Sequence, residues 1–182
     1  PNVIPGRDPE PEDINDEVLS DPANPLVGER QTFWDYRAAM NFVFGGMSSG
    51  VVVAATLCHF FFGLSSQTLL SLYVIAGIGM AIGLFFVFLE IGRKARFLLV
   101  LLRPQTSWMT RETYAVAIFY PALLADLVWP TPQLHLLLSL VALCFLFCQA
   151  RILYAAKGVP AWRVDLIPTM LLMAGLMEGV AL

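Results

Sequence analysis

The sequence has little charge, little histidine and little cysteine. Charged side chains make up 14% of its 182 residues, whereas ordinary soluble domains carry about 25%. The two histidines and three cysteines include no Cys-x-x-Cys pair, and all the cysteines fall in apolar runs, so we expect them to serve packing, and we predict no metal site. A glycine-rich phosphate loop, a nucleophile triad and a basic nucleic-acid surface are also absent from the sequence. These absences argue against a nucleotide enzyme, a hydrolase and a nucleic-acid-binding protein.

Hydrophobic residues, by contrast, make up 58% of the chain. Several apolar stretches reach about 20 residues, the length that crosses a bilayer. We therefore predict an all-α integral membrane protein, a transmembrane helix bundle in contact with membrane lipid. The expected spans are roughly 38–62, 68–92, 113–129, 133–154 and one that begins near 166 and continues past the end of the sequence.

The first 33 residues differ from the rest, because they are acidic and rich in proline. Such a segment buries too little apolar surface to fold alone. It is either a solvated tail or an extended arm that lies on a partner subunit. The sequence thus divides into a tail, 1–33, and a transmembrane anchor domain, 34–182.

Short links and small residues organise the spans. The links "GLSSQ" and "PTP" are short enough to force antiparallel hairpins. Glycines recur at a spacing of four, which lets two membrane helices approach closely; these pairs are Gly46 and Gly50, Gly79 and Gly83, and Gly175 and Gly179. Pro121 lies within the third span, where we expect a kink.

All cations fall on the side of the membrane that holds the tail. Alternating spans place the tail and the links 93–112 and 155–165 together, and the two short links carry no cation. The cations are Arg7, Arg30, Arg37, Arg93, Lys94, Arg96, Arg103, Arg111, Arg151, Lys157 and Arg163. The positive-inside rule predicts that this side is cytoplasmic, although cations that dock a partner protein would give the same asymmetry.

Ionisable residues within membrane spans are functional candidates, because burying a charge in lipid is costly. Glu90 closes the second span. It is either an interfacial carboxylate paired with Arg93 or Lys94, or the proton acceptor of a quinol head group, whose oxidation releases two protons with two electrons. Asp126 and Glu178 are each either structural or part of a proton path.

Two further groups leave alternatives open. His59 and His135 lie at similar depth near the far surface, so they are interfacial histidines or the two ligands of a b-type haem. Trp34, Tyr36 and Trp108 lie at the tail-side interface. They form an aromatic belt or line a quinone site.

Four stretches together resemble a known family. "FWDYRAAMNFVFGGMSSG", "LEIGRKARF", "RPQTSWMTRE" and "VPAWRVDLIPTMLLMAGLMEG" are similar to the membrane-anchor subunits of molybdopterin oxidoreductases, of the NrfD, polysulfide reductase and dimethyl sulfoxide reductase type. The resemblance covers roughly residues 33–182. It implies a haem-free bundle of about eight helices, in the cytoplasmic membrane of a prokaryote.

The resemblance also implies a function. Such anchors are non-catalytic or quinone-reactive subunits that exchange electrons between membrane menaquinone or ubiquinone and a docked iron–sulfur subunit, which serves a molybdenum or tungsten catalytic subunit with molybdopterin. Glu90 stands where relatives carry a residue tied to quinol binding, and Glu112 matches the acid after the Ser-Trp motif. Glu90 is then expected to be the quinol proton acceptor, and Glu112 to be a further catalytic residue of the same site. The expected docking residues are Arg93, Lys94, Arg96, Arg103 and Arg111, on a cytoplasmic face.

Two other functions remain alternatives: a haem b anchor that uses His59 and His135, and a proton-conducting membrane subunit built on Asp126 and Glu178. Only the first of these predicts a haem absorption band. Broken helices in an inverted repeat, which would favour a transporter, are not visible in the sequence.

Overall fold

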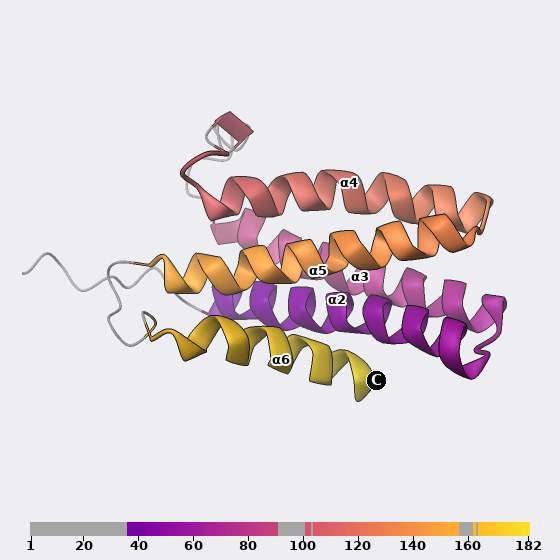
Figure 1. Ribbon diagram of the computed structural model, residues 1–182. Coiled ribbons are helices and arrows are strands. Elements are labelled where there is room, and N and C mark those ends of the chain that lie inside the picture. Colours follow the sequence, from indigo (N-terminus) through magenta and orange to yellow (C-terminus); the bar gives the residue numbers. More distant parts are fainter. Residues whose placement is uncertain (1–35, 91–100, 103, 157–161, 163) are drawn as a thin grey trace, which may run out of the picture. The chain divides into compact units, whose positions relative to one another are not determined.

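The computed structural model describes residues 36–90, 101–102, 104–156, 162 and 164–182, apart from the side chain of Glu90. These residues form five α-helices and no strand (Figure 1). The helices are α2 (Tyr36–Phe62), α3 (Ser66–Glu90), α4 (Trp108–Val128), α5 (Pro132–Tyr154) and α6 (Leu166–Val180). All five belong to one compact unit, Trp34–Leu182. Because the described residues form helices and no strand, the predicted all-α class is confirmed. The predicted tail 1–33 lies outside the described residues.

The hairpin of α2 and α3 is shaped by its turn residues. Gly63 ends α2 with a φ of 71°, a left-handed conformation that glycine adopts without steric cost. The amide of Leu64 then donates to the carbonyl of Cys58 at 3.2 Å. The Ser65 hydroxyl accepts from the Thr68 amide at 3.2 Å and caps α3. The chain therefore reverses within three residues, as the short link predicts.

The start of α4 corrects one prediction. We expected the third span to begin near Thr113, but the helix begins at Trp108. Ser107 is its N-cap, and the Ser107 hydroxyl accepts from the Thr110 amide at 3.3 Å, which satisfies one of the free donors of the first turn. Arg111 and Glu112 are therefore helical residues with fixed directions. The helix continues through Pro121.

The small-residue pairs make close contacts, as predicted. A Cβ added at Gly50 would overlap the carbonyl oxygen of Gly175, and one added at Gly179 would overlap the backbone of Gly50. On another side of α2, Gly79 of α3 faces Ser48. Because these glycines let α6 and α3 approach α2 closely, α2 lies at the centre and also packs against α5.

Two ends of the helix bundle are used below. The link end holds Tyr36, Glu90, Trp108, Tyr154 and Leu166, and the hairpin end holds residues 63–65 and 129–131 (Figure 1). Within the described residues, α2, α3 up to Leu89 and α5 are long and apolar enough to cross a membrane. The apolar helix α6 is shorter, and α4 carries Arg111, Glu112 and Asp126.

Candidate functional site

A buried carboxyl group lies at the link end. Glu112 of α4 is 7% exposed, and its Oε1 accepts from Nδ2 of Asn41 on α2 at 3.4 Å. Gln149 of α5 lies beside this carboxyl group, and its Nε2 donates to the Asn41 carbonyl at 3.0 Å. Within the described residues no Lys or Arg nitrogen forms a salt bridge with Glu112. Three helices thus hold one carboxyl group among amides.

The same cluster leaves two buried acceptors unused. Oδ1 of Asn41 and Oε1 of Gln149 have no hydrogen-bond partner among the described residues, although Asn41 and Gln149 are 4% and 2% exposed. A buried polar atom without a partner is rare in folded proteins. The two oxygens are therefore the unsatisfied acceptors of this cluster.

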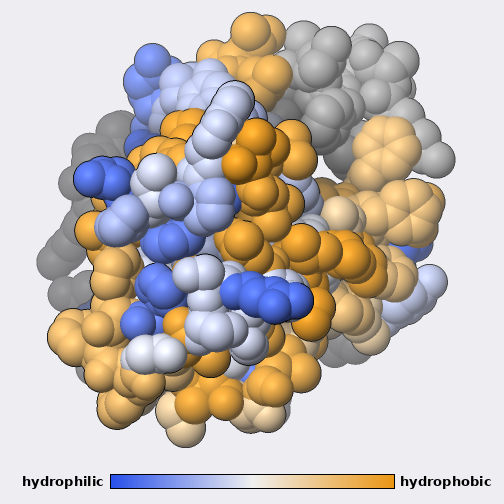
Figure 2. Space-filling model, turned by 90° about the vertical axis from the view of Figure 1, so that its right-hand side faces the viewer, coloured by the Kyte–Doolittle hydropathy of each residue, from blue (hydrophilic) through white to orange (hydrophobic). Residues whose placement is uncertain are grey.

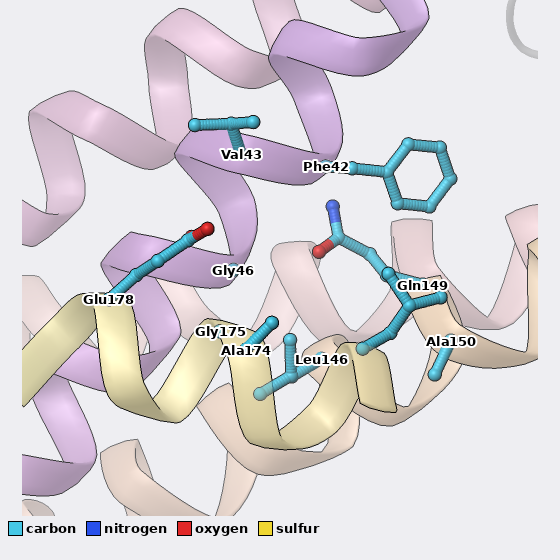
Figure 3. A pocket seen from close by; sticks show the side chains of 10 residues that line it. Phe42, Val43, Gly46, Leu146, Gln149, Ala150, Ala174, Gly175 and Glu178 are labelled. Atoms are coloured by element: carbon cyan, nitrogen blue, oxygen red, sulfur yellow. The ribbon is translucent and has the colours of Figure 1, made fainter. Parts of the chain in front are cut away.

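A pocket of about 90 Å³ opens beside Gln149, between α2, α5 and α6. Figure 3 shows Gln149 of α5 and Glu178 of α6 directed toward α2, on either side of Gly46. The remaining lining is apolar; it includes Phe42, Val43 and Leu146. The pocket is smaller than the roughly 300–1,000 Å³ of a typical ligand site, so it suits one ring or a side chain. Glu178, which we predicted as structural or proton-conducting, lies at its edge.

The predicted aromatic residues do not gather around Glu112. Tyr36 is 65% exposed and its ring meets Phe86 edge-on at 6.3 Å. Trp108 lies beneath cations: the Arg111 guanidinium carbon is 4.1 Å from its ring centroid, and that of Arg151 is 5.2 Å away. Trp34 and the side chain of Glu90 lie outside the described residues.

A second polar site lies toward the hairpin end. Oδ2 of Asp126 on α4 is 2.7 Å from Nδ1 of His135 on α5. Asp126 is fully buried and His135 is 3% exposed. Figure 2 looks at this end of the molecule and shows hydrophilic residues from its upper left edge to its centre, with hydrophobic residues below them and to their right. The prediction treated the two residues separately, whereas the structure joins them.

A hydroxyl network lies next to this pair. The Thr56 hydroxyl donates to the Val52 carbonyl at 2.7 Å, so its single proton is used. It therefore accepts from Ser139 at 2.7 Å and from the Tyr73 hydroxyl at 2.6 Å. Since Ser139 follows His135 by one helical turn on α5, the polar groups extend from the hairpin end into the core.

The arrangement of the two histidines does not match two ligands of one haem iron. Their rings meet edge to face, with centroids 5.4 Å apart, whereas two axial ligands must each direct a ring nitrogen at the same iron. Nδ1 of His59 is 2.6 Å from the Leu64 carbonyl oxygen. No cluster of three metal-ligating side chains occurs in the part of the chain that the structure describes.

Of the predicted docking residues, only Arg111 is described. Its Nε donates to the Pro104 carbonyl at 2.8 Å and one terminal nitrogen donates to the Gln105 carbonyl at 2.8 Å. Arg111 thus fixes the chain just before α4. The others, Arg93, Lys94, Arg96 and Arg103, lie outside the described residues.

Sequence reasoning missed Asn41, Gln149 and the pairing of Asp126 with His135. Asn41 and Gln149 are amides inside long apolar helices, and that rarity is a usable signal. Asp126 and His135 lie at nearly equal distances, four and five residues, from Pro130 in the middle of the short link between α4 and α5. An antiparallel hairpin therefore sets them at the same level, which the sequence could have indicated.

The fold and the buried polar groups define a helical membrane protein. The family described as "Polysulphide reductase, NrfD" matches residues 27–131, which is more than half of the 182 residues. The chain therefore belongs to the NrfD family, a family of membrane subunits of redox complexes. No curated protein and no solved structure matches the chain.

Proposed function

We propose that this chain exchanges electrons between a membrane quinone or quinol and an iron–sulfur subunit docked at the link end, within a molybdopterin oxidoreductase in the cytoplasmic membrane of a prokaryote. The quinone is menaquinone or ubiquinone. The chain's own part is to bind the quinone ring, hold its hydroxyl groups and move protons, while the electrons pass to clusters in the partner.

The observation that carries this proposal is the buried group of Glu112, Asn41 and Gln149. A quinol presents two hydroxyl donors, and the cluster offers a carboxyl group and two buried amide oxygens without partners. Apart from Gln149 and Glu178, the adjoining pocket is lined by apolar residues, which suits a ring entering from the bilayer. Buried acceptors that lack a partner reject a ligand without matching donors, because they would stay unpaired.

The proposed reaction releases protons and electrons in equal number. Oxidation of one quinol yields one quinone, two protons and two electrons. Glu112 takes one hydroxyl proton into its carboxylate. The second hydroxyl is held by an amide oxygen and gives its proton to Glu90. The electrons leave one at a time to the docked subunit. Glu90 and the cations Arg93, Lys94, Arg96 and Arg103 follow α3 in sequence. In this proposal Glu90 is the second proton acceptor, and the cations dock the partner subunit.

The test is binding of a fluorescent quinol analogue to membranes that hold the whole complex. We compare the parent chain with Glu112→Gln and with Glu90→Gln. The matched control is Asp165→Asn, which changes a link-end carboxylate that accepts only from Tyr154 in the described residues. Saturable quenching lost in Glu112→Gln and kept in Asp165→Asn supports the site. Equal quenching in all variants would place the quinone elsewhere, and no quenching in any would end the proposal.

A second function, proton conduction, is favoured by a separate observation. Buried polar side chains follow one line along α2: Asn41, then Ser48 and Ser49, then Thr56. At 1.5 Å per residue, Asn41 and Thr56 are about 22 Å apart along the helix axis. The Ser48 and Ser49 hydroxyl oxygens have no partner among the described residues, so water could bridge them.

This line joins the two polar sites. It begins at Asp126 and His135 toward the hairpin end, passes Thr56, and reaches Glu112 at the link end. In this second proposal the path supplies or removes the protons of quinone chemistry across the bilayer. Proton uptake per electron, measured in vesicles holding the complex, should fall in Asp126→Asn while electron transfer continues. An unchanged ratio of protons to electrons would remove the path.

A further inference from the structure

Two arginines share one tryptophan at the link end. Arg111 of α4 and Arg151 of α5 both lie over the Trp108 ring, at 4.1 and 5.2 Å. Arg151 also lies over the Tyr154 ring at 4.9 Å, and Phe147 meets Trp108 edge-on at 5.7 Å. The aromatic side chains hold both guanidinium groups in place, since cations bind to the faces of aromatic rings.

The positive charge of this pair is not neutralised by the described residues. Neither guanidinium forms a salt bridge with a described carboxylate. The acid nearest in the chain, Glu112, is bound by Asn41 in the buried cluster, and Asp165 accepts from Tyr154. Arg151 makes no side-chain hydrogen bond there, and its Nε is buried without a partner. Arg111 uses two of its donors on the Pro104 and Gln105 carbonyls, which leaves other terminal donors unused by the described residues. Two adjacent cations with such donors attract an anion.

The surroundings indicate which anion. Trp108 and Tyr154 are the residues that mark the interface of a bilayer. On α5, Phe147, Leu143 and Leu140 precede Arg151 at helical spacing and so share its face. These three side chains are 45%, 37% and 60% exposed. The charge at the interface thus continues into an apolar strip that runs toward the core of the membrane.

We infer that Arg111, Arg151 and Trp108 form a binding site for an anionic phospholipid. The phosphate accepts hydrogen bonds from the guanidinium groups, whose fork matches phosphate oxygens, and one acyl chain lies along Phe147, Leu143 and Leu140. An acidic loop of a partner protein would match the arginines but would leave the apolar strip without a role. The site does not depend on the proposed quinone chemistry.

The test measures lipid preference directly. The full chain is placed in vesicles of phosphatidylcholine that contain increasing fractions of phosphatidylglycerol with brominated acyl chains. Bromine quenches tryptophan on contact, and Trp108→Phe identifies the share of the signal that comes from the site. We expect Arg111→Gln and Arg151→Gln each to lower the preference for the anionic lipid about 10-fold, because a charge-assisted hydrogen bond is lost.

The matched control is Arg37→Gln, which removes a link-end cation whose guanidinium donates to the Leu89 carbonyl. It should keep the preference of the parent chain. Arg151→Lys keeps the charge without the planar fork, so its preference for the anionic lipid should lie between those of the parent chain and Arg151→Gln. The same variant tests the site if Arg151→Gln does not fold. Equal loss in Arg37→Gln would reduce the effect to general surface charge and overturn the site. Displacement of the lipid by millimolar inorganic phosphate, or no lipid preference at all, would overturn a phospholipid as its occupant.

Discussion

Removing either partner of the Asp126–His135 pair should destabilise the protein strongly. The two side chains lie 2.7 Å apart and are almost wholly buried. In Asp126→Leu, the imidazole Nδ1 of His135 loses its acceptor. In His135→Leu, the carboxylate keeps only the Thr131 amide, at 3.4 Å. A buried partner left alone costs about 3–5 kcal/mol, so we expect each single variant to lose about that much free energy of unfolding.

The double variant separates the pair from its two positions. Replacing both members of a buried pair with apolar residues is often close to neutral. Asp126→Leu with His135→Leu should therefore be more stable than either single variant, and the coupling energy should be at least about 2 kcal/mol. The measurement is unfolding of the detergent-solubilised protein by sodium dodecyl sulfate, followed by circular dichroism.

The control is the Tyr154–Asp165 hydrogen bond, which is 2.8 Å long but exposed. Tyr154→Phe removes it while keeping the ring, and we expect a loss of under about 1 kcal/mol. If the losses in free energy of unfolding of the two single variants add up to the loss of the double variant, within about 0.5 kcal/mol, the pairing at 2.7 Å is refuted. Single variants as stable as the parent chain would refute the burial argument.

Three further predictions concern local structure. Gly50→Leu should lower stability by about 1–3 kcal/mol through overpacking against Gly175 of α6. The control Leu57→Val, at an exposed position of the same helix, should change stability by under about 0.5 kcal/mol. Equal thermal midpoints of the two variants would contradict the close approach of α2 and α6. Gly63→Ala should cost about 1 kcal/mol because of its positive φ, and Gly63→Asn less, as detergent unfolding would show; an equal loss in both would remove the backbone explanation. Ser107→Ala should cost about 1 kcal/mol through the lost cap, and Ser107→Asp should restore it; failure of that rescue would exclude capping as the cause.

The positions of the helices could be predicted from the sequence to within a few residues at most ends. Hydrophobic runs fix where helices lie, because in lipid each backbone group must be satisfied within its own helix. The largest error, the start of α4, arose where polarity was read as a link. Ser107 shows the reason: a capped helix can begin with Trp-Met-Thr-Arg-Glu, since capping and helix propensity do not depend on hydropathy.

The candidate sites were only partly predictable. Asp126 and the two histidines stood out because charged or ionisable groups are rare in apolar runs, whereas Glu112 was predicted only through the family resemblance. Their partners did not, because Asn41, Gln149 and Ser139 gain meaning only from what they face. The distance in sequence between Asn41 and Glu112 is 71 residues, and no local pattern reports a contact of that range.

The sequence by itself thus determined a membrane-spanning helical bundle with close glycine contacts, and it predicts that the cations gather on one side. These properties follow from side-chain polarity and size along one helix at a time. Tertiary structure alone decided that Asp126 meets His135, that Asn41 and Gln149 surround Glu112, and that Arg111 and Arg151 share Trp108. Each of these contacts joins two or three helices. Their geometry depends on how far and at what rotation the helices pack, which is set by all the packed side chains together.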